Sequence, residues 1–136
     1  GQAPSFSSQT SSVRIVLKHR NHLAIMSNLI QNFSSGSVAS YDFTTALSQA
    51  SNDFDAPSRM VQKNGLWCMR PGDLNANQDF FVDGVDGSFF NVQFKGDVFS
   101  SYDRADINMD GFVDGVDGSL LNTSFYQDIY STLINY

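Results

Sequence analysis

The sequence contains no glutamate, and aspartate supplies all fourteen of its acidic residues. A helix surface that needs charge only for solubility uses glutamate freely, whereas aspartate favours loops, helix N-termini and metal sites. Hydrophobic residues occupy 41% of the 136 positions, which is enough for a packed core and excludes a wholly disordered chain. No apolar run approaches the roughly 18–20 residues that span a bilayer, so we expect no membrane insertion.

Cysteine is nearly absent. The single Cys68 excludes an intramolecular disulfide framework and a zinc site built on cysteine. Because free cysteine is among the most buried residue types, we expect Cys68 to be a buried, small hydrophobic side chain. The sequence also lacks a serine-nucleophile motif, a phosphate-binding glycine loop and a dinucleotide motif. These absences predict a protein that is not an enzyme.

Basic residues are scarce in the second half of the chain. Residues 1–70 carry six Lys or Arg and three Asp, whereas residues 71–136 carry two basic residues and eleven Asp. Because phosphate binding requires a basic surface, we expect no nucleic-acid partner. Ten of the Asp lie between Asp73 and Asp117, interleaved with Gly, Val and Phe at fixed spacings. This spacing favours ligand loops over a solvated acidic tail.

A duplication organises the acidic half. Val82–Ser88 and Val113–Ser119 are identical at all seven positions, with an offset of 31 residues. Further back, Asp73-Leu74-Asn75 corresponds to Asp106-Ile107-Asn108 at an offset of 33, so the first copy carries two additional residues. A duplication of this length predicts two similar structural units.

The second copy, Asp106–Asp117, has the spacing of an EF-hand-type calcium loop. Its oxygen-bearing side chains occupy loop positions 1, 3, 5, 9 and 12, and they are Asp106, Asn108, Asp110, Asp114 and Asp117. Gly111 allows the sharp turn after which the carbonyl of Phe112 supplies a backbone ligand. Val113 is expected to pair the two loops in a short β-bridge. Calcium is favoured over magnesium, which prefers to keep its waters.

The first copy, Asp73–Asp86, is less regular. It has fourteen residues, and Phe80 stands where the second copy has Gly111, so the turn geometry must differ. The candidate ligands are Asp73, Asn75, Asn77, Asp79, Asp83 and Asp86, with the carbonyl of Phe81. Either Asn77 or Asp79 takes the position-5 role. We expect a second calcium ion here, bound more weakly or with altered coordination.

Residues 72–136 resemble a dockerin-type repeat pair, in which Asp-x-Asn-x-Asp-Gly-x-Val-Asp-x-x-Asp and one helix occur twice. The resemblance implies two calcium loops, each followed by a helix, packed about a pseudo-twofold axis. Hydrophobic residues four apart support these helices independently and are expected to form the core: Phe90 and Phe94, then Leu121, Phe125, Ile129 and Leu133.

The first half has a second resemblance. Val13–Met26, which contains Lys-His-Arg-Asn-His-Leu, is followed by Tyr41–Thr45 and Gly65–Met69. This order looks like a β-rich "KHRNHL" module of secreted Bacteroidota surface proteins, where it precedes calcium repeats near the C-terminus of larger chains. The resemblance implies an extracellular or cell-surface location. Because the chain starts at Gly1 without Met, we expect a processed or excised part of a larger surface protein, or a subunit of a homopolymer.

We predict an α+β fold, with a small β-sandwich-like module followed by a dockerin-like pair of calcium loop–helix repeats. The domains are a flexible arm or linker (1–12), a β-rich module (13–70) and the duplicated calcium module (71–136). The expected strands are Val13–Lys18, in which alternate residues are apolar, and the segments Leu23–Met26, Leu29–Ile30, Val38–Thr44 and Leu66–Met69.

The predicted function is non-catalytic. His19 and His22 are three apart, which on an extended segment directs them to opposite faces and argues against joint metal ligation. We expect an extracellular calcium-binding module for protein–protein docking or assembly at the cell surface. The alternative is a self-assembling subunit of a filament or layer, because four or five short strands form a thin sheet that another copy could complete. The partner is another protein or copies of this chain.

Overall fold

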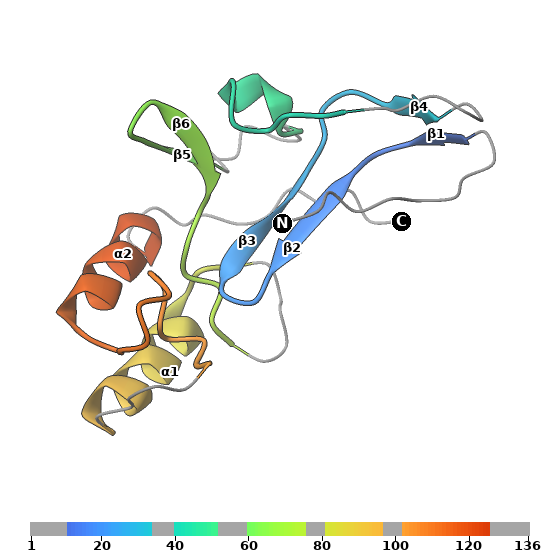
Figure 1. Ribbon diagram of the computed structural model, residues 1–136. Coiled ribbons are helices and arrows are strands. Elements are labelled where there is room, and N and C mark those ends of the chain that lie inside the picture. The colour runs from blue at the N-terminus through green and yellow to red at the C-terminus, as the bar shows by residue number, and fades with distance from the viewer. Residues whose placement is uncertain (1–10, 34–39, 52–59, 76–80, 97–101, 126–136) are drawn as a thin grey trace.

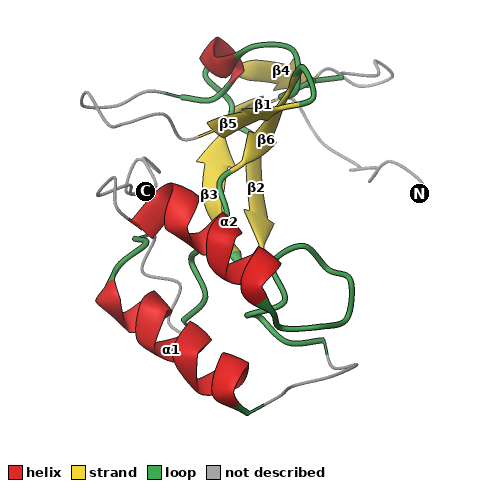
Figure 2. Cartoon of the chain, turned by 90° about the vertical axis from the view of Figure 1, so that its left-hand side faces the viewer, coloured by secondary structure: helices red, strands yellow, loops and turns green. Residues whose placement is uncertain are grey.

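The computed structural model describes residues 11–33, 40–51, 60–75, 81–96 and 102–125. Its elements in chain order are β1 (Ser11–Val13), β2 (Val16–His19), β3 (His22–Met26), β4 (Gln31–Phe33), a 3-10 turn (Leu47–Gln49), β5 (Met60–Lys63), β6 (Leu66–Met69), α1 (Gly84–Lys95) and α2 (Gly115–Phe125) (Figure 1). The predicted α+β class is confirmed. Figure 2 shows the two helices together at one end of the molecule and the strands at the other.

The strands form three separate antiparallel pairs, β1 with β4, β2 with β3 and β5 with β6. Each strand has three to five residues. The sandwich-like arrangement therefore has no support among the described residues, since a sandwich requires two larger sheets packed face to face.

The predicted strand Val13–Lys18 is interrupted. Its break lies at Arg14 and Ile15, where Ser27 holds the chain: the Ile15 N–H donates to Ser27 Oγ at 3.0 Å, and Arg14 Nη1 donates to the Ser27 carbonyl at 2.9 Å. Val16 and Leu17 are exposed, so the expected half-buried alternation does not occur in β2. β1 begins at Ser11, inside the predicted arm, whose residues 1–10 lie outside the described residues.

The predicted strand Val38–Thr44 is wrong for the described residues 40–44, none of which is in a strand and of which 43 and 44 form a turn. Asp42 Oδ1 accepts hydrogen bonds from the N–H (2.8 Å) and the hydroxyl (2.7 Å) of Thr44. These bonds lower the pKa of Asp42. An aspartate that accepts from the backbone two residues on competes with strand pairing, and this explains the turn.

The hairpin β5–β6 contains a strand that the prediction missed. Asn64 and Gly65 connect its strands with positive φ angles of 51° and 82°, the conformation of a two-residue hairpin turn. The Asn-Gly dipeptide was the available signal. Cys68 is exposed on this hairpin, so the expectation of a buried cysteine is wrong. A hairpin with one solvent-facing side places alternate residues of β6 in water.

Strand β3 passes through both hydrophobic cores. Leu23 belongs to the core under the helices, whereas Ile25 belongs to a second core with Phe43, Ala50 and Met60. The predicted segment Leu23–Met26 is thereby confirmed as buried strand. Leu29 and Ile30, also predicted as apolar strand, are instead 63% and 54% exposed and precede β4.

The core under the helices repeats the duplication of the sequence. It contains three pairs of equivalent residues: Leu74 and Ile107, Val82 and Val113, and Phe90 and Leu121 from the helices. The helices also pack reciprocally. A Cβ atom on Gly87 of α1 would lie 3.0 Å from the Phe125 ring, and one on Gly118 of α2 would lie 3.3 Å from the Phe90 ring.

The predicted apolar stripes are only partly core. Phe90 and Leu121 are buried and Phe125 is half-buried, as expected. Phe94 is 45% exposed and stacks on Phe90 with their ring centroids 5.7 Å apart, so its assignment to the core is wrong. Ile129 and Leu133 lie outside the described residues.

Candidate functional site

The second loop directs its first side-chain oxygens inward. Asp106 Oδ1 and Asn108 Oδ1 both accept from the N–H of Asp110, at 3.1 and 3.0 Å. Asp106 Oδ2 also accepts from the N–H of Gly111 at 3.1 Å. The two residues predicted as ligands at positions 1 and 3 therefore converge on one amide.

Two residues with positive φ make this loop possible. Gly111 has a φ of 92°, in agreement with its predicted role in the turn, and Met109 has a φ of 64°. The sequence analysis did not single out Met109. Asp110 stabilises the turn because its Oδ1 accepts the Phe112 N–H at 3.0 Å, while its Oδ2 accepts Asn108 Nδ2 at 2.9 Å.

The carboxylates at positions 9 and 12 hold the start of α2. Asp117 is fully buried, and its Oδ1 accepts the N–H groups of Ile107 (2.7 Å) and Asn108 (3.0 Å). Its Oδ2 accepts the N–H of Asp114 at 2.9 Å, and Asp114 Oδ1 in turn accepts the Val116 N–H at 2.7 Å. Asp117 thus ties the start of the loop to the first turn of the helix.

The first loop repeats this closure. Asp86, also fully buried, accepts the N–H groups of Leu74 (2.7 Å) and Asn75 (3.0 Å) with Oδ1 and that of Asp83 (2.9 Å) with Oδ2. Asp83 accepts the Val85 N–H at 2.7 Å, which completes a capping box on α1. Burial raises the pKa of Asp86, and the three donated hydrogen bonds oppose that shift.

The remaining first-loop ligands divide into two groups. Asp73 and Asn75 are buried at the start of the loop, as the ligand assignment requires. Asn77 and Asp79 lie outside the described residues, so the choice between them at position 5 stays open.

Phe81 in the first loop and Phe112 in the second are both β-bridge residues. These are the position-7 residues whose carbonyls were predicted as ligands. The expected bridge at Val113 is wrong by one position, because Val113 is buried in the core, as is its counterpart Val82. Since side chains alternate along an extended segment, a buried residue 8 leaves residue 7 facing outward, and both Phe side chains are exposed.

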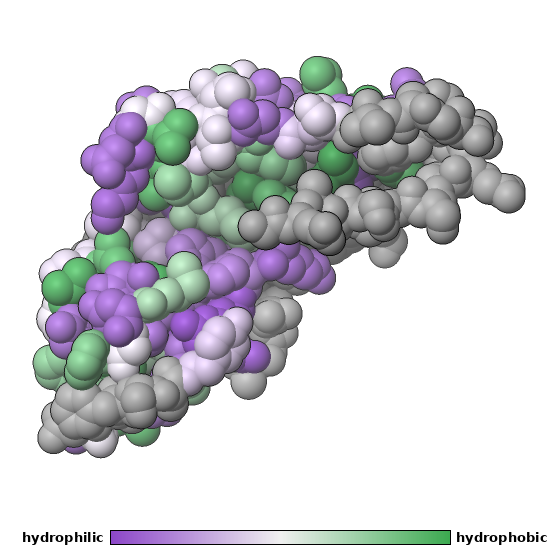
Figure 3. All heavy atoms as spheres, in the orientation of Figure 1, coloured by the Kyte–Doolittle hydropathy of each residue, from purple (hydrophilic) through white to green (hydrophobic). Residues whose placement is uncertain are grey.

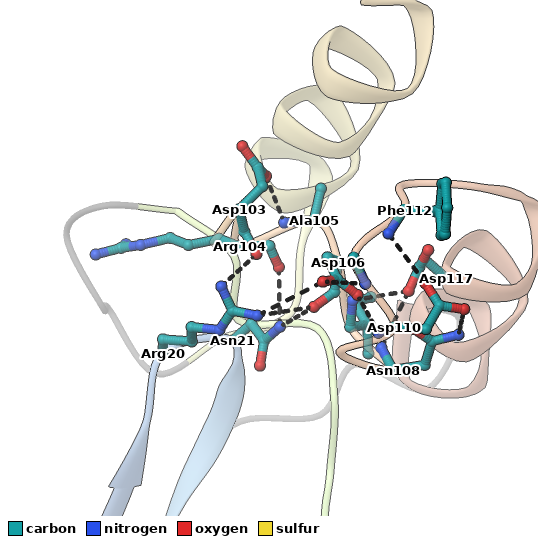
Figure 4. A network of polar contacts seen from close by, with 12 residues as sticks. Arg20, Asn21, Asp103, Arg104, Ala105, Asp106, Asn108, Asp110, Phe112 and Asp117 are labelled. Carbon is teal, nitrogen blue, oxygen red and sulfur yellow. Dashed lines mark hydrogen bonds and ion pairs between the residues drawn. The ribbon is translucent and has the colours of Figure 1, made fainter. Parts of the chain in front are cut away.

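The tip of the β2–β3 hairpin contacts the second loop, and sequence reasoning missed this contact (Figure 4). Arg20 donates from Nη1 to the Asp103 carbonyl (2.6 Å) and from Nη2 to the Asp106 carbonyl (3.3 Å), and Nη2 lies 3.9 Å from Asp106 Oδ2. Its guanidinium also lies over the Tyr102 ring, 3.8 Å from the centroid. The basic tip of the hairpin therefore rests against the acidic loop.

His19 and His22 face each other, contrary to the expectation of opposite faces. The turn at Arg20 and Asn21 pairs them across the hairpin, with their Nδ1 atoms 3.0 Å apart. Asn21 Nδ2 donates to two carbonyls, so Asn21 Oδ1 is the atom that faces His22 Nδ1 at 2.7 Å. His22 Nδ1 must then carry a proton, which prevents it from binding a metal while this network is intact.

His22 predicts a loss of stability in mild acid. Burial, and then the positive charges of His19 and Arg20, lower the pKa of His22 from 6.5 to about 4. Between these pH values His22 is protonated in the unfolded chain but neutral in the folded chain. The free energy of unfolding is therefore highest above pH 6.5, and it falls by about 3 kcal/mol by pH 4.

This loss is measurable by urea unfolding at pH 7 and pH 5 in saturating calcium, where carboxylates of ordinary pKa stay ionised. We expect a decrease of about 2 kcal/mol. His22→Gln keeps an N–H for Asn21 but does not titrate, and its stability should change much less. An equal decrease in both proteins would contradict the assignment to His22.

The donor set of the loops fits a hard cation. Carboxylate, amide and main-chain oxygens are the ligands that calcium takes in proteins. Among the described residues, His, Cys and Asp side chains do not gather in groups of three or more. Asp117 Oδ2 and Asp86 Oδ2 each accept one N–H, which leaves each oxygen a second lone pair for a cation.

Comparisons of the chain with protein-family models, with curated proteins and with solved structures find no match. Within the described ranges, no helix has the length and apolar character needed to cross a membrane.

Proposed function

We propose that this chain is a non-catalytic, extracellular calcium-binding module for docking or assembly at the cell surface, with a dockerin-like pair of loop–helix repeats. The main support is the repeated loop closure: Asp86 and Asp117 accept hydrogen bonds from three equivalent residues of the two loops. Two loops that share this closure are expected to bind the same kind of ion.

Electrostatics gives calcium a structural role. Asp73, Asp86, Asp106 and Asp117 are buried carboxylates of the two related loops. Like charges in a small volume repel, and bound divalent cations remove that repulsion. Calcium loops are filled at the millimolar calcium of extracellular fluids, which supports the proposed location.

The calcium proposal is tested by comparing two matched substitutions. Asp106→Asn removes a charge from the second loop but keeps one oxygen, and Asp42→Asn makes the same change in an exposed turn outside both loops. By titration calorimetry we expect two calcium ions in the wild type, and a loss of at least tenfold in affinity at one site in Asp106→Asn. Asp42→Asn should bind like the wild type. Equal effects of the two changes, or no calcium binding at all, would refute the loop assignment.

The helix end of the molecule offers a surface for docking. Figure 3 shows hydrophilic residues gathered over the loop that leads into α2, with hydrophobic residues exposed beside them. Phe112 and Val116 are exposed apolar residues of the second repeat, and their counterparts Phe81 and Val85 in the first repeat are exposed as well. Exposed apolar groups with a polar rim are typical of protein–protein interfaces.

Self-assembly is the second candidate, and the short strands favour it. Two-stranded sheets are marginal alone, and Leu29 and Ile30 are exposed beside β4. A strand from another copy could pair with such a sheet and cover these side chains. Sedimentation in millimolar calcium and in excess chelator separates the candidates: ordered polymers that dissolve on chelation indicate a subunit, and a monodisperse species indicates a docking module.

A further inference from the structure

Asn21 contacts the main chain at the start of both loops. It is fully buried at the tip of the β2–β3 hairpin. Its own carbonyl accepts the N–H of Gly72 at 2.9 Å, directly before Asp73, the first residue of the first loop. Its Nδ2 donates to the carbonyl of Asp106, the first residue of the second loop, at 2.9 Å. A single residue from outside the duplication therefore contacts the residue before the first loop and the first residue of the second loop.

A second path joins the loops through Arg104. Asn21 Nδ2 also donates to the Arg104 carbonyl at 3.0 Å, and Arg104 Nη1 donates to the carbonyl of Asn75 in the first loop. Arg20 fixes the same segment through the carbonyls of Asp103 and Asp106. Hydrogen bonds therefore connect the first loop to Arg104, Arg104 to Asn21 at the hairpin tip, and Asn21 to the second loop.

We propose that Asn21 is a positioning residue that couples the two calcium loops, so that an ion in one loop raises the affinity of the other. This proposal rests on the proposed calcium function. Calcium in the second loop restricts Asp106, whose carbonyl then holds the Asn21 amide in place, and a fixed Asn21 holds Gly72 beside the first ligand of the first loop. The second ion binds a loop whose ordering is already complete, which is the basis of positive cooperativity.

The test is a double-mutant cycle on the full chain, followed by calcium titration calorimetry. Asp73→Asn disables the first loop, and we expect it to lower the calcium affinity of the second loop about tenfold when Asn21 is present. In an Asn21→Ala background the same change should leave the second loop's affinity nearly constant. Asn91→Ala, an exposed asparagine on α1, is the matched control and should keep the tenfold effect.

Hydrogen exchange tests the coupling without changing Asn21. In Asp73→Asn only the second loop is intact. Calcium should still slow hydrogen exchange of the Gly72 N–H, which donates to the Asn21 carbonyl. The coupling would be overturned if calcium left the exchange rate of Gly72 unchanged. It would also be overturned if Asp73→Asn lowered the affinity of the second loop as much in the Asn21→Ala background as with Asn21 present. Both results would leave calcium binding in place. A wild-type chain that binds no calcium would overturn both proposals.

Discussion

Asp117→Ala is expected to lower the free energy of unfolding by at least about 3 kcal/mol, because three backbone N–H groups lose their acceptor. Asp117 is fully buried, so water can replace its carboxylate only after the loop opens. The same loss is expected for Asp86→Ala in the first loop, which has the matching set of donors. Urea unfolding in saturating calcium measures both.

Asp114→Ala is the comparison for this result. Asp114 accepts a single N–H near the surface, and loss of such a helix cap costs about 1 kcal/mol. If Asp117 acted only as a calcium ligand, more calcium would restore the stability of Asp117→Ala. We expect no such rescue, since the three amides remain without a partner at any calcium concentration. Complete rescue would show that loop closure contributes little.

Gly72→Ala is expected to cost about 3 kcal/mol, from backbone strain together with overpacking. Gly72 has a φ of 125°, where side chains are rarely tolerated. A Cβ atom there would also lie 2.8 Å from Val82 Cγ1 and 3.2 Å from Leu121 Cδ1. Both neighbours belong to the core under the helices, so they have little room to move.

Gly65→Ala separates the two contributions to this effect. Gly65 also has a positive φ, 82°, but a Cβ atom there would meet nothing within 4 Å. We expect this substitution to cost only about 1 kcal/mol, from strain alone. Thermal unfolding of the two variants in calcium provides the comparison. A Gly65→Ala protein as unstable as Gly72→Ala would mean that packing at Gly72 is unimportant.

The regular spacing of the second loop made much of its geometry predictable. The side chains at positions 1, 3 and 5 accept N–H groups within the loop, and Gly111 has the expected positive φ. That Asp117 both closes the loop and is a candidate ligand was harder to predict from the sequence. An aspartate at helix position N3 is compatible with metal ligation and with a capping box, and only the positions of the amides distinguish them.

The first half was predicted less well because its strands depend on distant residues. Ser27 breaks the strand before β2 through hydrogen bonds across 12 residues, which a local alternation of apolar residues does not reveal. The contact of Arg20 and Asn21 with residues 103–106 spans more than 80 positions. Such long-range contacts follow from tertiary packing, and single-sequence patterns do not contain them.

The packing of α1 against α2 makes the two repeats structurally different from each other. Gly87 and Gly118 are equivalent positions of the two copies, but the aromatic rings against them are not: Phe125 corresponds to Phe94, whereas Phe90 corresponds to Leu121. The Phe90 ring lies against Gly118, which leaves Phe94 outside the core. A pair made of two first repeats would therefore place Phe90 and Phe94 twice in the interface between the helices. A pair made of two second repeats would place Leu121 and Phe125 there twice, and these side chains differ in volume from the present set. We therefore expect the two halves to be complementary partners that cannot be interchanged.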